Sequence, residues 1–254
     1  MASGTGSRAW ATWWERRIVV ECKPGERIIV ALDVPELDAA LDLAERLAPV
    51  VGAVKVGLEL FNAEGPRALT ALAATGARVF YDAKLHDIPN TVAGALRAAL
   101  AWRPWMINVH ASGGSAMLRA AAEAAGSAGE HRPLVIAVTL LTSLSPEQVR
   151  DELGVARPAS EQVVALARLA QDSGLDGVVA SPLEAAAIRA ACGPAFVIVT
   201  PGVRPAGAAL GDQQRAATPR AARAAGADYL VVGRPITAAE DPVAAARMIA
   251  EELA

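Results

Sequence analysis

The sequence predicts a single (β/α)8, or TIM, barrel with a short N-terminal extension. From Ile28 onward, short β-branched runs alternate with longer stretches rich in Ala, Leu and Arg that carry helical periodicity, and eight such pairs follow one another. The apolar runs are nearly continuous, as expected for parallel strands that are covered on both faces. The length of 254 residues and the 53% content of hydrophobic residues suit one closed barrel.

The expected strands are these apolar runs, each followed by a helical stretch. In chain order they span 28–33 (IIVALD), 52–58 (GAVKVGL), 77–83 (ARVFYDA), 105–110 (WMINVH), 133–141 (PLVIAVTLL), 175–181 (LDGVVAS), 196–201 (FVIVTP) and 228–233 (DYLVVG). A stretch rich in Gly and Pro, 201–214, separates the seventh strand from its helix. A loop of this length inside a compact barrel usually has a functional role.

Residues 1–26 lie outside the repeating pattern, so we expect an N-terminal extension there and the barrel domain over 27–254. The extension contains Trp10, Trp13 and Trp14. Clustered tryptophans can anchor in a groove, which would make the segment a capping element. The other interpretation is a disordered leader that takes no part in the fold.

Composition excludes several classes of protein. The 24 basic and 27 acidic residues give a net charge of −3, so no basic field for nucleic acid is present. No uncharged apolar run reaches the roughly 18 residues of a membrane span. Cys22 and Cys192 are too few for a disulfide framework and are expected to be free thiols in a reducing compartment. We therefore expect a cytoplasmic enzyme without nucleic-acid or membrane partners.

Polar residues end several of the expected strands, at the barrel face where active sites of this fold lie. They are Asp33, Lys55, Asp82, Lys84, His110, Thr142, Gly233 and Arg234. Charges sealed in an apolar core would cost several kcal/mol unless paired, so these must pair with one another or face a ligand. A structural cluster of ion pairs that closes the barrel is the alternative.

The segment YDAKLHDIPNTV, 81–92, places Asp82, Lys84 and Asp87 in a D-x-K-x-x-D spacing. This segment resembles the orotidine 5′-phosphate decarboxylase family of bacterial type. Further motifs carry the same resemblance, which runs from about residue 28 to 252: IIVALDV, VKVGLELF, VTLLTS, VTPGVRP and VVGRPIT.

The resemblance implies decarboxylation of orotidine 5′-monophosphate to uridine 5′-monophosphate, the last step of pyrimidine nucleotide (UMP) synthesis, without a metal or an organic cofactor. Loss of CO2 from carbon 6 leaves a vinylic carbanion that needs a fixed cation beside it. Lys84, flanked by Asp82 and Asp87, is expected to stabilise this carbanion and to protonate it. Asp82 would repel the departing carboxylate, and Lys55 would hold Asp82 and contact the ribose.

The resemblance also assigns the substrate contacts. Asp33 is expected to accept hydrogen bonds from the ribose hydroxyls and Thr142 to contact the pyrimidine, with Ser143 a weaker candidate. Loops after strands seven and eight often bind phosphate in barrels, and the residues expected to do so here are Arg204, Gln213, Gly233 and Arg234. In the family, the residues matching Asp87 and Thr91 enter the neighbouring subunit's site, which implies a homodimer.

Two other functions stay open. A sugar-phosphate decarboxylase or hexulose-phosphate synthase shares D-x-K-x-x-D but uses Mg2+, for which Glu59 is the nearest additional carboxylate. A catalytically silent barrel that binds nucleotide phosphate is the second. The residues Asn108, His86, His110 and His131 are expected to be structural or exposed.

Overall fold

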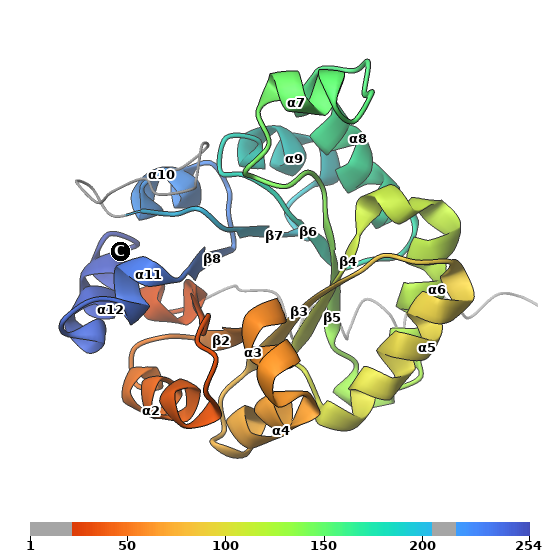
Figure 1. The fold of residues 1–254 in the computed structure, drawn as a ribbon. Helices are drawn as coiled ribbons and strands as arrows, with labels where there is room; N and C mark the ends of the chain where they lie inside the picture. The colour runs from red at the N-terminus through yellow and green to blue at the C-terminus, as the bar shows by residue number, and fades with distance from the viewer. Residues whose placement is uncertain (1–21, 205–216) are drawn as a thin grey trace, which may run out of the picture.

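The computed structural model describes residues 22–204 and 217–254 of the chain. In these residues, eight parallel strands close into one barrel in the order of the sequence, and helices surround it (Figure 1). The strands are β1 (Ile28–Ala31), β2 (Ala53–Val56), β3 (Val79–Leu85), β4 (Met106–His110), β5 (Leu134–Val138), β6 (Gly177–Val179), β7 (Val197–Thr200) and β8 (Tyr229–Val232). The predicted (β/α)8 barrel is confirmed.

Every strand is followed by at least one α-helix in the part of the chain that the structure describes. The helices are α2 (Leu37–Leu47), α3 (Leu58–Glu64), α4 (Pro66–Ala74), α5 (Pro89–Ala99), α6 (Gly114–Gly126), α7 (Pro146–Asp151), α8 (Ala159–Asp172), α9 (Ala185–Cys192), α10 (Pro219–Ala224), α11 (Arg234–Thr237) and α12 (Pro242–Glu251). Short 3-10 helices occupy η1 (Pro24–Arg27), η2 (Leu100–Trp102), η3 (Ala111–Gly113) and η4 (Gly129–His131). Within residues 22–204 and 217–254, each helix is too short or too polar to span a bilayer.

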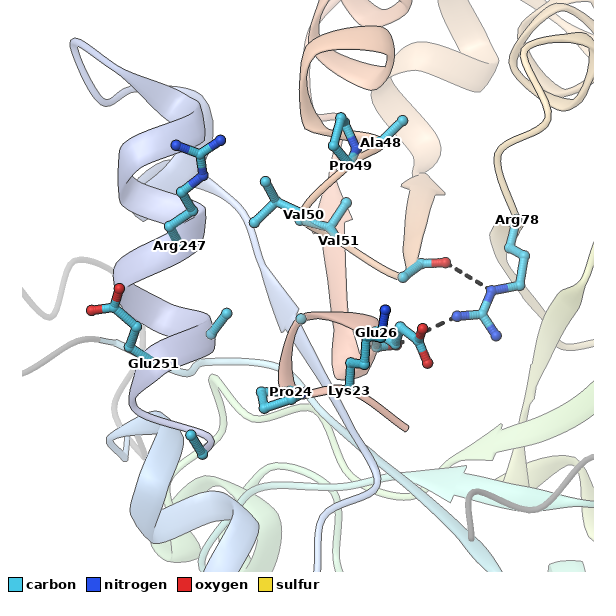
Figure 2. A pocket seen from close by; sticks show the side chains of 14 residues that line it. Lys23, Pro24, Glu26, Ala48, Pro49, Val50, Val51, Arg78, Arg247 and Glu251 are labelled. Carbon is cyan, nitrogen blue, oxygen red and sulfur yellow. Dashed lines mark hydrogen bonds between the residues drawn. The ribbon is translucent and has the colours of Figure 1, made fainter. Parts of the chain in front are cut away.

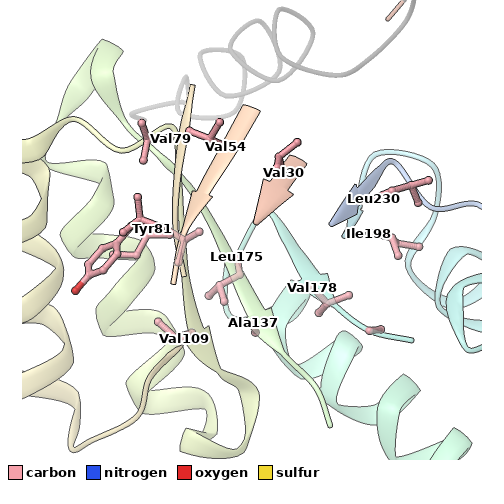
Figure 3. Packing of buried hydrophobic residues seen from close by; sticks show 14 of the residues in the cluster. Val30, Val54, Val79, Tyr81, Val109, Ala137, Leu175, Val178, Ile198 and Leu230 are labelled. Carbon is pink, nitrogen blue, oxygen red and sulfur yellow. The ribbon is translucent and has the colours of Figure 1, made fainter. Parts of the chain in front are cut away.

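The strand residues divide into two hydrophobic layers because successive side chains of a strand point to opposite faces. Ile29 and Ala31 of β1 belong to the layer inside the barrel, together with Phe80 and Met106. Ile28 and Val30 belong to the layer between strands and helices, part of which is drawn in Figure 3. The nearly continuous apolar runs of the sequence reflect these two buried faces.

The observed strands lie within the predicted ranges and are mostly shorter, with one exception. β5 ends at Val138 although the apolar run continues to 141, because Leu140 and Leu141 already belong to the loop after the strand. β3 instead continues to Leu85, two residues beyond the predicted end, and its pairing with β4 becomes irregular between Tyr81 and Leu85. This irregular segment carries Asp82 and Lys84 of the predicted catalytic motif.

The described chain begins at Cys22, and η1 leads directly into β1. Arg27, at the end of η1, is buried and donates a hydrogen bond to the carbonyl oxygen of Asp228 at 3.4 Å. The three tryptophans of the predicted extension lie outside the described residues. The boundary between extension and barrel at residues 26 and 27 stays a prediction.

Candidate active site

Two lysines and two aspartates form a continuous chain of ion pairs at the carboxyl ends of β1, β2 and β3. Lys84 Nζ donates a hydrogen bond to Asp82 Oδ1 at 2.8 Å. Lys55 Nζ lies 3.2 Å from the other oxygen, Asp82 Oδ2, and donates to Asp33 Oδ1 at 3.1 Å. The structure therefore brings together four of the residues that the sequence predicted at this face of the barrel.

Strand periodicity explains why Lys55 and Asp82 point into the barrel. Ala53 and Phe80 belong to the inner hydrophobic layer, and Lys55 and Asp82 follow them by two residues, on the same face of their strands. Lys55 also pairs with Phe80 in the register of β2 and β3. The two charged side chains thus form the polar end of an otherwise apolar barrel interior.

Exposure increases along the chain of ion pairs from the interior to the mouth. The side chains of Lys55 and Asp82 are 9% and 11% exposed, that of Lys84 is 31% exposed, and that of Asp33 is 54% exposed. Burial alone would raise the pKa of Asp82, but the ammonium groups of Lys55 and Lys84 and their hydrogen bonds outweigh burial and lower it. Asp82 is therefore a carboxylate at neutral pH.

Lys84 has a backbone conformation that non-glycine residues rarely adopt. Its φ is +50°, in the left-handed region, where a side chain costs about 1–2 kcal/mol. Its backbone N–H donates to the side-chain oxygen of Asn108 at 2.7 Å. Such conformations persist only where the surroundings hold them, and they cluster at functional sites.

Two glycines leave room at the mouth of the barrel. A Cβ at Gly57 would lie 2.8 Å from Lys55 Nζ and 3.1 Å from Asp33 Oδ1, so a side chain there would displace the ion pair. A Cβ at Gly233 would lie 3.7 Å from Asp33 Oδ2, which places the carboxyl end of β8 beside Asp33. The segment that begins at Gly233 and continues into α11 therefore shares one mouth with the ion pairs.

The other residues predicted to bind substrate lie on loops at the same end of the strands. Thr142 follows β5 and is partly buried, and Arg234 is the exposed first residue of α11. Arg204 follows β7, and its guanidinium donates to the carbonyl oxygen of Val203 at 3.0 Å. Gln213 lies outside the described residues.

In the described part of the chain, Asp87 and Thr91 form no hydrogen bond or ion pair with the lysines of the site. Both are exposed, and Asp87 Oδ1 accepts a hydrogen bond from the backbone N–H of Ile88 at 2.6 Å. Among residues 22–204 and 217–254, no hydrogen bond or ion pair joins Asp87 to Lys84. The expected flanking of Lys84 by two aspartates therefore holds for Asp82 alone in the single chain.

The family is decided by comparison with known proteins. The profile of the "Orotidine 5'-phosphate decarboxylase / HUMPS family" matches residues 26–249. The chain belongs to this family. A curated relative named orotidine 5′-phosphate decarboxylase from Moorella thermoacetica is 59% identical over 232 residues, which cover 90% of this chain and 92% of the relative. One of the same name from Halorhodospira halophila is 60% identical over 228 residues, 90% of this chain and 96% of the relative.

Solved structures agree with the family assignment. A structure titled as orotidine 5′-phosphate decarboxylase from Lactobacillus acidophilus superposes with a TM-score of 0.78 at 39% identity, covering 89% of this chain and 98% of that one. An uncharacterized conserved protein from Geobacillus kaustophilus gives a TM-score of 0.77 at 41% identity, covering 89% of this chain and 100% of that one.

Asn108, which the sequence placed near the site as a structural residue, contacts the centre of the ion pairs directly. Asn108 is 1% exposed, and its Nδ2 donates to Asp82 Oδ1 at 2.6 Å. The rings of His86 and His110 lie 5.4 Å apart. Burial lowers the pKa of His110, and His86 and Lys84 lower it further. Strand periodicity could have placed Asn108, because it follows Met106 of the inner layer by two residues.

The carboxylate considered for Mg2+ in the metal-dependent relatives, Glu59, is exposed on the first turn of α3. In the described part of the chain, no group of three or more His, Cys, Asp or Glu side chains lies in an arrangement that could hold a metal ion. The ammonium groups of Lys55 and Lys84 both pair with Asp82, at 3.2 Å and 2.8 Å.

A groove of about 820 Å3 lies at the opposite end of the barrel, between η1, α12 and the segment before β2 (Figure 2). Lys23, Glu26, Arg78, Arg247 and Glu251 contribute charges of both signs to its walls. The Arg78 guanidinium donates to the carbonyl oxygens of Gly52 and Glu26. Because active sites of this fold lie at the carboxyl ends of the strands, this groove is separate from the candidate active site.

Proposed function

We propose that the protein decarboxylates orotidine 5′-monophosphate to uridine 5′-monophosphate and CO2, the last step of UMP biosynthesis, without a metal or an organic cofactor. The observation that carries the proposal is the Lys84–Asp82–Lys55–Asp33 chain of ion pairs at the carboxyl ends of β1 to β3. It occurs in a chain whose curated relatives of 59–60% identity are named orotidine 5′-phosphate decarboxylase.

In the proposed reaction, the bond between carbon 6 and the carboxylate breaks, CO2 leaves, and the electron pair stays on carbon 6. The Lys84 ammonium, fixed by Asp82 at 2.8 Å, would stabilise this carbanion and then transfer one N–H proton to it. A cation that is already in place needs no reorganisation when the charge develops. Its 31% exposure leaves the ammonium accessible to a substrate at the mouth.

Asp82 and Lys55 would prepare the site for this step. Asp82 is held ionised, so a substrate carboxylate placed beside it would be repelled until CO2 departs. Lys55 binds Asp82 and Asp33 at once, and it would contact the ribose. Asp33 is more than half exposed, which suits an acceptor for ribose hydroxyls.

The pyrimidine and the phosphate would be bound by the loops around this centre. Thr142 would contact the pyrimidine ring, and Gly233 and Arg234 would bind the phosphate next to Asp33. We assign Arg204 and Gln213, on the loop after β7, to the phosphate and to closure over it. Phosphate-binding energy would in this way help assemble the reactive site.

We also propose a homodimer in which Asp87 and Thr91 complete the partner's site. Both residues are exposed at the mouth, and Ile88 between them is 68% exposed. The proposal is supported by the family resemblance, in which the residues matching Asp87 and Thr91 enter the neighbouring subunit's site. Mixing the Lys84→Ala and Asp87→Ala variants should restore about a quarter of the activity, because half of the dimers would be mixed and each would have one intact site of two. No restoration would contradict a shared site.

Cys22 and Cys192 are both free thiols in the described part of the chain. We propose that the enzyme is cytoplasmic, because a reducing environment keeps such thiols unpaired. Immunodetection after cell fractionation tests this location. Recovery of the protein outside the cytoplasmic fraction would contradict it.

The experiment that tests the function follows the absorbance of orotidine 5′-monophosphate after the purified protein is added, with and without EDTA. We expect equal decarboxylation in both. Absence of decarboxylation in both would favour the metal-dependent sugar-phosphate relatives, to be tested with sugar phosphates and Mg2+, and loss of activity in EDTA alone would contradict a metal-independent reaction. Binding of uridine 5′-monophosphate without any turnover would favour a silent binding barrel.

A further inference from the structure

We propose that Asn108 is a positioning residue that fixes Lys84 and Asp82 relative to each other. The inference rests on the proposed function, because it concerns the same two side chains. One amide group contacts both: its oxygen accepts from the backbone N–H of Lys84 at 2.7 Å, and its nitrogen donates to Asp82 Oδ1 at 2.6 Å. Both contacts are shorter than the usual N–H···O distance of about 2.9 Å.

The two hydrogen bonds need an amide in this position. A carboxamide has an acceptor on one side and a donor on the other, and only one of its two orientations satisfies both Lys84 and Asp82. An aspartate at 108 would set a second carboxylate against Asp82. A leucine would leave the Lys84 N–H and one interaction of Asp82 unsatisfied, and at 1% exposure of Asn108 water has little access to replace them.

The strand pairing shows why a side chain is needed here. Tyr81 pairs with Ile107, and Leu85 pairs with Val109, so β3 advances four positions (81 to 85) while β4 advances two (107 to 109). The backbone ladder between β3 and β4 is therefore interrupted over the segment that contains Asp82 and Lys84. Asn108 lies opposite this interruption, and its side chain supplies the cross-strand hydrogen bond that Lys84 would otherwise lack.

This arrangement connects the strained backbone of Lys84 to the orientation of Asp82. Asp82 Oδ1 accepts from both Asn108 Nδ2 and Lys84 Nζ, so the amide fixes the carboxylate that in turn holds the ammonium. The φ of +50° at Lys84 is held by the same amide through its oxygen. Asn108 need not touch the substrate to determine where the ammonium lies.

Two variants of Asn108 test the inference in the full-length protein. For Asn108→Ala we expect kcat for orotidine 5′-monophosphate to fall about 10- to 100-fold, because one charge-assisted hydrogen bond to Asp82 and one hydrogen bond from the Lys84 backbone are lost. The Kd of uridine 5′-monophosphate, which has no carboxylate on carbon 6, should change by less than about threefold. For Asn108→Asp we expect kcat to recover as pH falls from about 8 to 5, because only the protonated carboxyl can donate to Asp82.

Asp176→Asn is the matched control. Asp176 is also buried, but it directly precedes β6 at the opposite end of the barrel, where it accepts from Arg132 and from the backbone N–H of Val135. This variant should lower the melting temperature and leave kcat and its pH profile unchanged. A kcat of Asn108→Ala within twofold of the unmodified protein, or a flat pH profile for Asn108→Asp, would overturn the inference.

A crystal structure of Asn108→Ala gives a result that does not depend on turnover. We expect Lys84 to leave the left-handed region or the Asp82 carboxylate to rotate away from Lys84. Unchanged positions of both residues would overturn the positioning role whatever the activity. Failure of the unmodified protein to decarboxylate orotidine 5′-monophosphate would instead overturn the proposed function, while the crystal structure still decides the role of Asn108.

Discussion

Asp82→Asn tests whether the carboxylate at the centre of the ion pairs stabilises the folded protein. Asp82 accepts from Lys84 Nζ at 2.8 Å and Asn108 Nδ2 at 2.6 Å on one oxygen, and pairs with Lys55 Nζ at 3.2 Å through the other. An asparagine removes the charge and replaces one oxygen by a donor. At least one of the three contacts then becomes donor against donor, and two ammonium groups lose their shared counter-ion.

The expected loss of stability follows from the burial of these groups. Removing one partner of a fully buried ion pair costs about 3–5 kcal/mol. Lys84 is 31% exposed and Lys55 keeps Asp33 at 3.1 Å, so we expect the lower end of this range, about 3 kcal/mol. For a domain of this size, 1 kcal/mol corresponds to about 2–4 °C, so the melting temperature should fall by about 6–12 °C.

Urea unfolding followed by circular dichroism at pH 7 measures this loss. Asp151→Asn is the control, because its ion pair with Arg150 is more than 60% exposed on both sides and its removal should leave the unfolding midpoint unchanged. The pKa of Asp82 is lower in the folded protein than in the unfolded chain. Its contribution to the free energy of unfolding is therefore complete above the pKa of an unfolded aspartate and is lost as pH falls through the lower pKa of the folded protein. The variant and the unmodified protein should therefore converge in strong acid. Equal or greater stability of Asp82→Asn at pH 7 would refute this reasoning.

Three further predictions concern the mouth of the barrel. Arg234→Ala should raise KM for orotidine 5′-monophosphate at least about tenfold and also lower kcat, because a charge-assisted contact to phosphate is lost. Steady-state kinetics measures both constants, and unchanged values would mean that the phosphate binds elsewhere. Gly57→Ala should lower the free energy of unfolding by about 1–3 kcal/mol, since its Cβ would lie 2.8 Å from Lys55 Nζ. Urea unfolding measures this loss, and an unchanged midpoint would contradict it by showing that the ion pair adapts. The pKa of His110 is lowered in the folded protein, so the unfolded state binds a proton more readily and the free energy of unfolding should decrease as pH falls below about 6.5. His110→Gln should therefore lose less stability between pH 7 and 5 than the unmodified protein. An identical pH dependence of the two proteins would contradict the effect.

The fold could be predicted from sequence because each strand is an apolar run and each helix follows it. The positions of Lys55 and Asp82 could also be predicted, since strand periodicity sends them to the same interior as Ala53 and Phe80. The interruption of pairing between β3 and β4 could not be predicted, because its signature is a left-handed lysine rather than a glycine. For the same reason the role of Asn108 could be seen only in the structure. Among residues 22–204 and 217–254, no hydrogen bond or ion pair joins Asp87 to a lysine.

The measurement that tests the central claim most directly compares Lys84→Ala with Lys23→Ala. Lys23 is exposed at the opposite end of the barrel, so it serves as a lysine control. If Lys84 stabilises the carbanion, its replacement should lower kcat for orotidine 5′-monophosphate by more than about a thousandfold, with the Kd of uridine 5′-monophosphate changed less than about tenfold. Lys23→Ala should match the unmodified protein in both quantities. Retained turnover in Lys84→Ala would contradict the proposed mechanism.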